Sequence, residues 1–130
     1  MTRTVPFRQG GQTWHLLMNG AALFDIYEKF GTKGFVLDHI RGAGRETLEP
    51  TCWLLAKLAE QGELLRRYQG YDKGPIPDPE RFQLCLSPLD VLRAKRAITM
   101  AVQEGFRRDE DESKSVDKGL LELEKKTEAP

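Results

Sequence analysis

The sequence has little of what metal centres, disulfide frameworks and membrane spans require. It has two cysteines, Cys52 and Cys85, which are far apart and form no CxxC pair, and two histidines, His15 and His39. Neither a disulfide framework nor a tetrahedral metal site is therefore expected. The chain has no run of about 18 apolar residues, and its start lacks the residue order of a signal peptide. We expect a cytosolic protein that does not contact a membrane.

An excess of positive charge is also missing. The chain has 20 Lys and Arg residues against 20 Asp and Glu residues, so its formal net charge is zero. Binding to nucleic acid normally needs a basic excess gathered in a patch. Here the basic residues Arg93, Lys95 and Arg96 are soon followed by the acidic run 109–112. We expect solvated helix faces and no nucleic-acid partner.

Catalytic motifs are equally scarce. His15 falls on a predicted strand, facing away from its two neighbours, and His39 follows Asp38 in a predicted helix, where adjacent side chains do not face each other. The chain has no Gly-x-Ser-x-Gly elbow, Walker loop or GxGxxG order. We therefore expect no enzyme, no cofactor and no metal. A cleft in which His15 or His39 meets a carboxylate would revive the enzymatic interpretation.

The N-terminal part of the chain predicts a β-hairpin followed by a capped helix. Two short apolar runs within residues 4–17 flank Gly10-Gly11, and adjacent glycines supply the positive φ angles of a two-residue turn. Pro6 removes one backbone donor, which predicts that the first strand is an edge strand or is interrupted at that point. Asn19 can cap a helix whose apolar residues recur at i, i+3, i+4 and i+7, and Gly31 ends it.

Three further helices are predicted. The segment 48–69 is apolar over more than one stripe, one of which is formed by Leu54, Leu58, Leu65 and Tyr68, so it should be central to the core. Gly62 in its middle predicts a bend or a close helix contact. Ser87-Pro88 is a typical start for a helix over 88–107. A shorter helix over 34–41 is bounded by glycines.

These elements predict a single α+β, mostly α domain over residues 1–108. An N-terminal two-stranded hairpin (4–17) should pack on a bundle of three or four helices, at about 19–30, 34–41, 48–69 and 88–107. The expected core residues lie on the apolar helix faces: Leu23, Ile26, Tyr27, Phe30, Leu54, Leu55, Leu58, Ile98 and Val102.

The remaining segments are connectors and a tail. Three prolines and two glycines in 70–79 predict a loop, and 81–86 is too short to assign as extended or helical. Residues 109–130 carry many charges and no aromatic residue, which predicts a disordered C-terminal tail. Within that tail, Leu120, Leu121 and Leu123 could form a short amphipathic helix.

The hairpin and its helix carry two sequence patterns. The first is F-x-x-G-G-x-x-x-x-L, from Phe7 to Leu16, and the second is A-L-x-D-I-Y-E-K-F-G, from Ala22 to Gly31. Together they resemble the opening of tail assembly chaperones from long-tailed bacteriophages of Gram-positive hosts. The likeness covers about the first quarter of the chain closely, and beyond it only a general plan of helices and a polar tail.

The resemblance implies a chaperone that works in the host cytoplasm. It would bind the tape measure protein, keep it soluble and support polymerisation of the tail tube, by transient contact with a partner helix. The residues expected to make that contact are Leu120 and Leu121 first and Trp14 second. The tail tube protein and further copies of the chain are additional candidate partners.

A different class of protein remains as the alternative. The chain could be a structural tail or head-completion component, or a phage-encoded regulatory adaptor. In those cases the free edge of the hairpin would pair permanently with a neighbouring protein.

Overall fold

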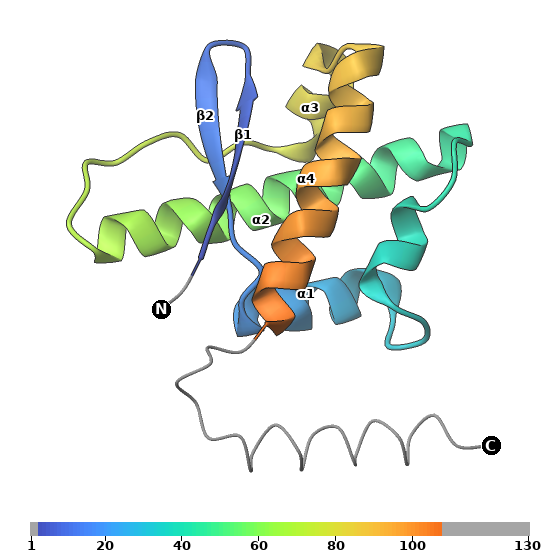
Figure 1. Ribbon diagram of the computed structural model, residues 1–130, viewed down its shortest axis with the longest axis horizontal. Coiled ribbons are helices and arrows are strands. Elements are labelled where there is room, and N and C mark those ends of the chain that lie inside the picture. The colour runs from blue at the N-terminus through green and yellow to red at the C-terminus, as the bar shows by residue number, and fades with distance from the viewer. Residues whose placement is uncertain (1–2, 108–130) are drawn as a thin grey trace, which may run out of the picture.

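The computed structural model describes residues 3–107 of the chain. A two-stranded sheet, β1 (Val5–Gln9) and β2 (Gln12–Leu16), is followed by the helices α1 (Gly20–Phe30), η1 (Val36–Ile40), η2 (Arg45–Thr47), α2 (Leu48–Tyr68), α3 (Pro79–Cys85) and α4 (Pro88–Phe106), of which η1 and η2 are short 3-10 helices. The helix α4 crosses α2, and α1 lies below them (Figure 1). The predicted α+β, mostly helical class is confirmed.

The hairpin is closed by the predicted glycine turn. Gly10 and Gly11 have φ angles of 60° and 76°, and Gln9 pairs with Gln12 across the turn. In an antiparallel pair the backbone groups of alternate residues point away from the partner strand. Counting from the closing pair, Pro6 is one of these residues, so its missing donor removes no bond within the hairpin. The predicted edge strand is confirmed.

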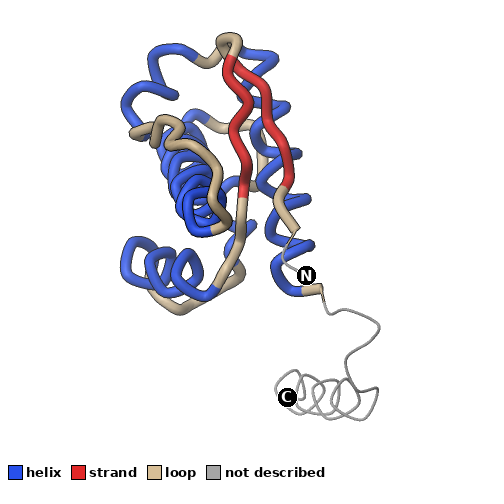
Figure 2. The backbone as a smooth tube through the Cα atoms, turned by 90° about the vertical axis from the view of Figure 1, so that its left-hand side faces the viewer, coloured by secondary structure: helices blue, strands red, loops and turns tan. Residues whose placement is uncertain are grey.

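The hairpin lies between α2 and α4 (Figure 2). The strand β2 faces α2, and just past its end the amide of Leu17 donates to the carbonyl of Leu58 at 3.0 Å. One turn further along α2, Gly62 lies against the backbone carbonyl of His15. The expected close contact of Gly62 with another helix is therefore wrong, because the close neighbour is the strand β2. This contact covers the second edge of the hairpin.

Side-chain caps begin the helices where the sequence predicted. The Asn19 carboxamide oxygen accepts a hydrogen bond from the amide of Ala22 at 2.9 Å, and Ser87 forms a reciprocal capping box with Asp90. The segment left open as a connector is the helix α3. Its cap is Asp78, whose carboxylate accepts from the amide of Arg81 at 2.8 Å.

Six of the nine expected core residues are buried, namely Ile26, Leu54, Leu55, Leu58, Ile98 and Val102. The other three, Leu23, Tyr27 and Phe30, are only partly buried. Phe82 of α3 is a fully buried residue that the sequence did not place in the core. It packs edge-on against Trp14, with ring centroids 5.6 Å apart.

The expected burial of two aromatic residues, Trp14 and Tyr68, is wrong. Trp14 was expected to be an exposed contact residue, but it is only 3% exposed because α3 brings Phe82 onto its ring. Tyr68 was expected on an apolar core stripe of α2, but it is 90% exposed at the last residue of that helix. The other two expected contact residues, Leu120 and Leu121, lie outside the described residues.

Candidate partner-binding groove

One side of α2 faces away from the core and presents a row of mixed apolar and charged side chains. The row consists of Trp53, Lys57, Glu60, Leu64 and Tyr68, and we call it the α2 row. Spacings of three and four residues place all five on one side of a helix. Leu64 is 43% exposed and Tyr68 is 90% exposed, while Trp53 is partly buried. The row extends about 22 Å along the helix axis.

The surface is hollowed on both sides of Trp53. Towards α1, an open hollow of about 330 Å³ is lined by Trp53 and Lys57 together with Asp25, Glu28 and Lys29. Towards the loop before α3, a smaller hollow of about 110 Å³ is lined by the same two residues with Ala56, Glu60, Pro77 and Pro79. We call the two hollows and the α2 row the α2 groove. The Trp53 side chain is shared by both hollows.

Charged and aromatic neighbours hold the Trp53 ring in place. Lys57 Nζ lies 5.7 Å from the ring centroid, 2.9 Å from Glu60 Oε1 and 3.1 Å from Asp25 Oδ2. Burial lowers the pKa of Lys57, but the hydrogen bonds to Glu60 and Asp25 outweigh it and hold the pKa above its ordinary value. Lys57 therefore stays charged. Phe30 also contacts the Trp53 ring, in an edge-on arrangement with ring centroids 5.5 Å apart.

The arrangement fits the contact of a helix better than the capture of a small molecule. Tryptophan and tyrosine are the side chains that most often dominate binding energy at protein interfaces. A ring that is already fixed loses little side-chain entropy when a partner covers it. The two hollows lie at the Trp53 end of the α2 row. The whole row runs about 22 Å along the helix axis, which corresponds to four turns of a partner helix.

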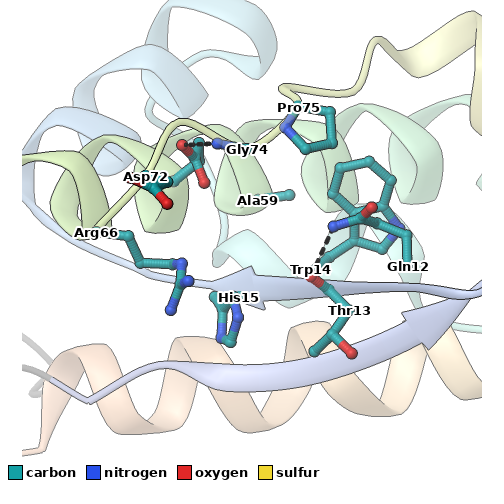
Figure 3. A pocket seen from close by; sticks show the side chains of 10 residues that line it. Gln12, Thr13, Trp14, His15, Ala59, Arg66, Asp72, Gly74 and Pro75 are labelled. Atoms are coloured by element: carbon teal, nitrogen blue, oxygen red, sulfur yellow. Dashed lines mark hydrogen bonds between the residues drawn. The ribbon is translucent and has the colours of Figure 1, made fainter.

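The cleft beside β2 was the site at which the enzymatic interpretation could have been revived. Figure 3 shows His15 and Arg66 together on one side of this cleft, with Asp72 and Gly74 on the other. Its volume is about 70 Å³, which leaves room for a few water molecules. Pockets that bind small molecules are usually several times larger, at about 300 to 1,000 Å³.

The one carboxylate of this cleft that is buried is engaged in holding the loop after α2. Glu63 Oε2 accepts hydrogen bonds from the amide of Gly74 at 2.8 Å and from Arg67 Nε at 2.7 Å. Burial raises the pKa of Glu63. The two hydrogen bonds and the charges of Arg67 and Arg66 lower the pKa by more than burial raises it, so the net shift is downward. Glu63 is thus an ionised anchor for the loop.

The histidines are placed for packing. Burial, followed by the charge of Arg66, lowers the pKa of His15 against the opposing effect of Glu63, which favours the neutral imidazole. His39 stacks on Phe30, with ring centroids 4.3 Å apart. Within residues 3–107, no hydrogen bond joins either histidine to a carboxylate, and no group of three or more His, Cys, Asp or Glu side chains could hold a metal ion.

The structural-component alternative requires an edge of the hairpin that is free to pair with a strand of another protein. On the outer edge of β1, Pro6 has no amide proton, and the carbonyl of Arg8 accepts a hydrogen bond from Arg93 Nη2 at 3.0 Å. The other edge, on β2, is covered by α2 at Leu17 and Gly62. Strand addition to either edge would have to displace one of these contacts.

Sequence reasoning did not find the α2 groove. Its chosen contact residue, Trp14, belongs to the core, and the groove combines α1, α2 and the loop before α3, which are far apart in the sequence. A local signal was present in the spacing of the α2 row, where Lys57 and Glu60 interrupt an otherwise apolar stripe. Charged residues at those positions indicate a helix side that faces solvent.

Comparisons with known proteins add no relative. No protein-family model, curated protein or solved structure matches this chain. Among the helices of residues 3–107, none combines the length and the hydropathy that crossing a membrane would need.

Proposed function

We propose that this protein is a phage tail assembly chaperone that binds an amphipathic helix of the tape measure protein in the α2 groove. The observation that carries the proposal is the groove itself, in which a fixed tryptophan lies between two open hollows on the outer side of the longest helix. The resemblance of the hairpin and α1 to tail assembly chaperones supports the choice of partner.

In the proposed mechanism the groove covers the apolar face of a partner helix. Trp53 contacts the middle of that face, and Leu64 and Tyr68 extend the contact towards the end of α2. Because Lys57 and Lys29 both lie within 6 Å of the Trp53 ring centroid, the anchor is ordered before the partner arrives. The larger hollow is open to solvent, so the contact can be reversed when the tail tube polymerises around the tape measure protein.

Co-expression with the tape measure protein of the same phage tests the proposal. The tape measure protein should move from the pellet to the supernatant and co-purify with the chaperone. Tyr68→Ala and Trp53→Ala should reduce the soluble fraction at least severalfold. Leu84→Ala is the matched control, because Leu84 is 87% exposed, nearly as much as Tyr68, but lies on α3 outside the groove.

Thermal unfolding of each variant separates loss of binding from loss of fold. Tyr68→Ala should unfold at the same temperature as the unmodified protein, since its side chain is almost fully exposed. A tape measure protein that stays insoluble at every ratio would overturn the chaperone proposal. Stoichiometric amounts of the protein in purified virions would then support the structural-component alternative.

A further inference from the structure

The outer face of α4 is a second apolar surface, separate from the α2 groove. It consists of Leu89, Leu92, Arg96, Met100 and Gln103, spaced by three or four residues, and we call it the α4 face. Leu89, Leu92 and Met100 are 65%, 64% and 49% exposed. The opposite side of the same helix is buried through Ala94, Ile98, Ala101 and Val102. Nothing in residues 3–107 covers these apolar side chains.

The centre of the α4 face is positively charged. Arg96 forms no ion pair or hydrogen bond with any other residue of 3–107, whereas the neighbouring Arg93 is paired with Asp90 at 2.7 Å. A second copy packed antiparallel on this face would place Arg96 near its own equivalent, and like charges at close range oppose such contact. The surface is complementary to an apolar segment that carries carboxylates.

A segment of this composition follows α4 in the same chain. Residues 119–124 have the sequence GLLELE, which combines three leucines at positions 120, 121 and 123 with Glu122 and Glu124. The three leucines can pack on the apolar side chains on either side of Arg96, and a carboxylate can pair with Arg96 itself. The segment lies outside the described residues, so this match rests on the α4 face and the sequence.

The connection is long enough for the segment to return along α4. From Phe106, the last residue of α4, Arg96 lies about 15 Å and Leu89 about 26 Å back along the helix axis, at 1.5 Å per residue. The residues from 108 to 119 can span up to about 40 Å. A tether of this length keeps the leucines near the face at an effective concentration on the order of millimolar.

We propose that residues 120–124 dock on the α4 face of their own chain and cap it in the free protein. The contact buries three leucines against Leu92 and Met100 and brings Glu122 or Glu124 to Arg96. The proposal concerns α4 and does not depend on the partner of the α2 groove. Its consequence is that the C-terminal leucines are occupied until a competing apolar segment displaces them.

Paramagnetic relaxation enhancement on the full chain tests the contact. A nitroxide is attached to Lys126→Cys in a Cys85→Ser background, since Cys85 is exposed and Cys52 is buried. Burial and the charge of Glu49 raise the pKa of the Cys52 thiol to about 11, so it does not compete for the label. The amide signals of Leu92 and Met100 are then compared with and without reduction of the nitroxide.

The expected result is loss of the Leu92 and Met100 signals, and their return when Leu120, Leu121 and Leu123 are all changed to aspartate. Arg96→Glu should restore at least half of the lost intensity. Signals that are equally intense in the leucine and aspartate chains would overturn the proposal. Loss of signal in a mixture of nitroxide-labelled and separately isotope-labelled chains would show that a second copy occupies the face, which also overturns it.

Discussion

The backbone carbonyl of His15 occupies the space that a side chain on Gly62 would need. A Cβ atom added to Gly62 would lie far inside van der Waals contact with that oxygen. The obstacle is backbone of β2, which cannot move without disturbing the hairpin. Gly62→Ala should therefore destabilise the fold by about 1 to 3 kcal/mol or more, despite the better helix propensity of alanine. Chemical denaturation measures the change.

Gly20→Ala is the matched control for this substitution. Gly20 is also a helical glycine, but a Cβ added there has no atom within 4 Å. The change should be neutral or stabilise the protein by up to about 1 kcal/mol. Equal effects at the two positions would show that the contact between His15 and Gly62 is not tight.

Truncating Leu58 tests the core position of α2. Its side chain is fully buried, so Leu58→Ala should lower the free energy of unfolding by about 2 to 5 kcal/mol. Leu64→Ala removes the same atoms from the same helix at a position that is 43% exposed, and should cost less than about 1 kcal/mol. An unchanged melting curve for Leu58→Ala would place that residue at the surface.

The carboxylate of Glu63 should make the free energy of unfolding depend on pH. Its pKa in the folded protein is lowered, since the hydrogen bonds from Gly74 and Arg67 outweigh the effect of burial. A group of this kind stabilises the fold above its ordinary pKa of 4.5, and the contribution is lost as the pH falls through the lower pKa of the folded protein. Glu63→Gln should be less stable at pH 7 and lose less stability on acidification. Parallel pH dependence in both proteins would contradict the anchoring role.

Removing residues 109–130 should leave the fold intact. The described core is complete without them, because Leu58, Phe82 and Ile98 are all fully buried within residues 3–107. Docking of residues 120–124 on the α4 face would cover the outside of the fold, so its loss removes no residue of this core. Circular dichroism during heating should show a cooperative transition in the truncated protein. Loss of that transition would mean that Leu120, Leu121 and Leu123 belong to the core.

Local signals in the sequence were sufficient for most of the fold. The glycine turn at Gly10-Gly11, the cap at Asn19 and the Ser87-Pro88 helix start each depend on neighbouring residues, and the structure confirms all three. The helix α3 was left undecided, because a helix of seven residues gives little periodicity.

The errors at Trp14 and Tyr68 have a tertiary cause. Trp14 is buried by Phe82, which arrives from a helix far along the chain. Tyr68 continues an apolar pattern but lies at the last residue of α2, where no element of residues 3–107 covers it. A helix pattern shows which side chains share a face, but it does not show where the packing partner ends.

The fluorescence of Trp53 is the most direct test of the central claim that a helix of the tape measure protein occupies the α2 groove. The chain has two tryptophans, so Trp14→Phe makes Trp53 the only one left. The substitution breaks no hydrogen bond within residues 3–107, because the Trp14 indole nitrogen has no partner there. When the soluble tape measure complex forms, Trp53 emission should shift to shorter wavelength and become protected from iodide quenching. A complex in which Trp53 stays as accessible to iodide as in the free protein would contradict binding in the groove.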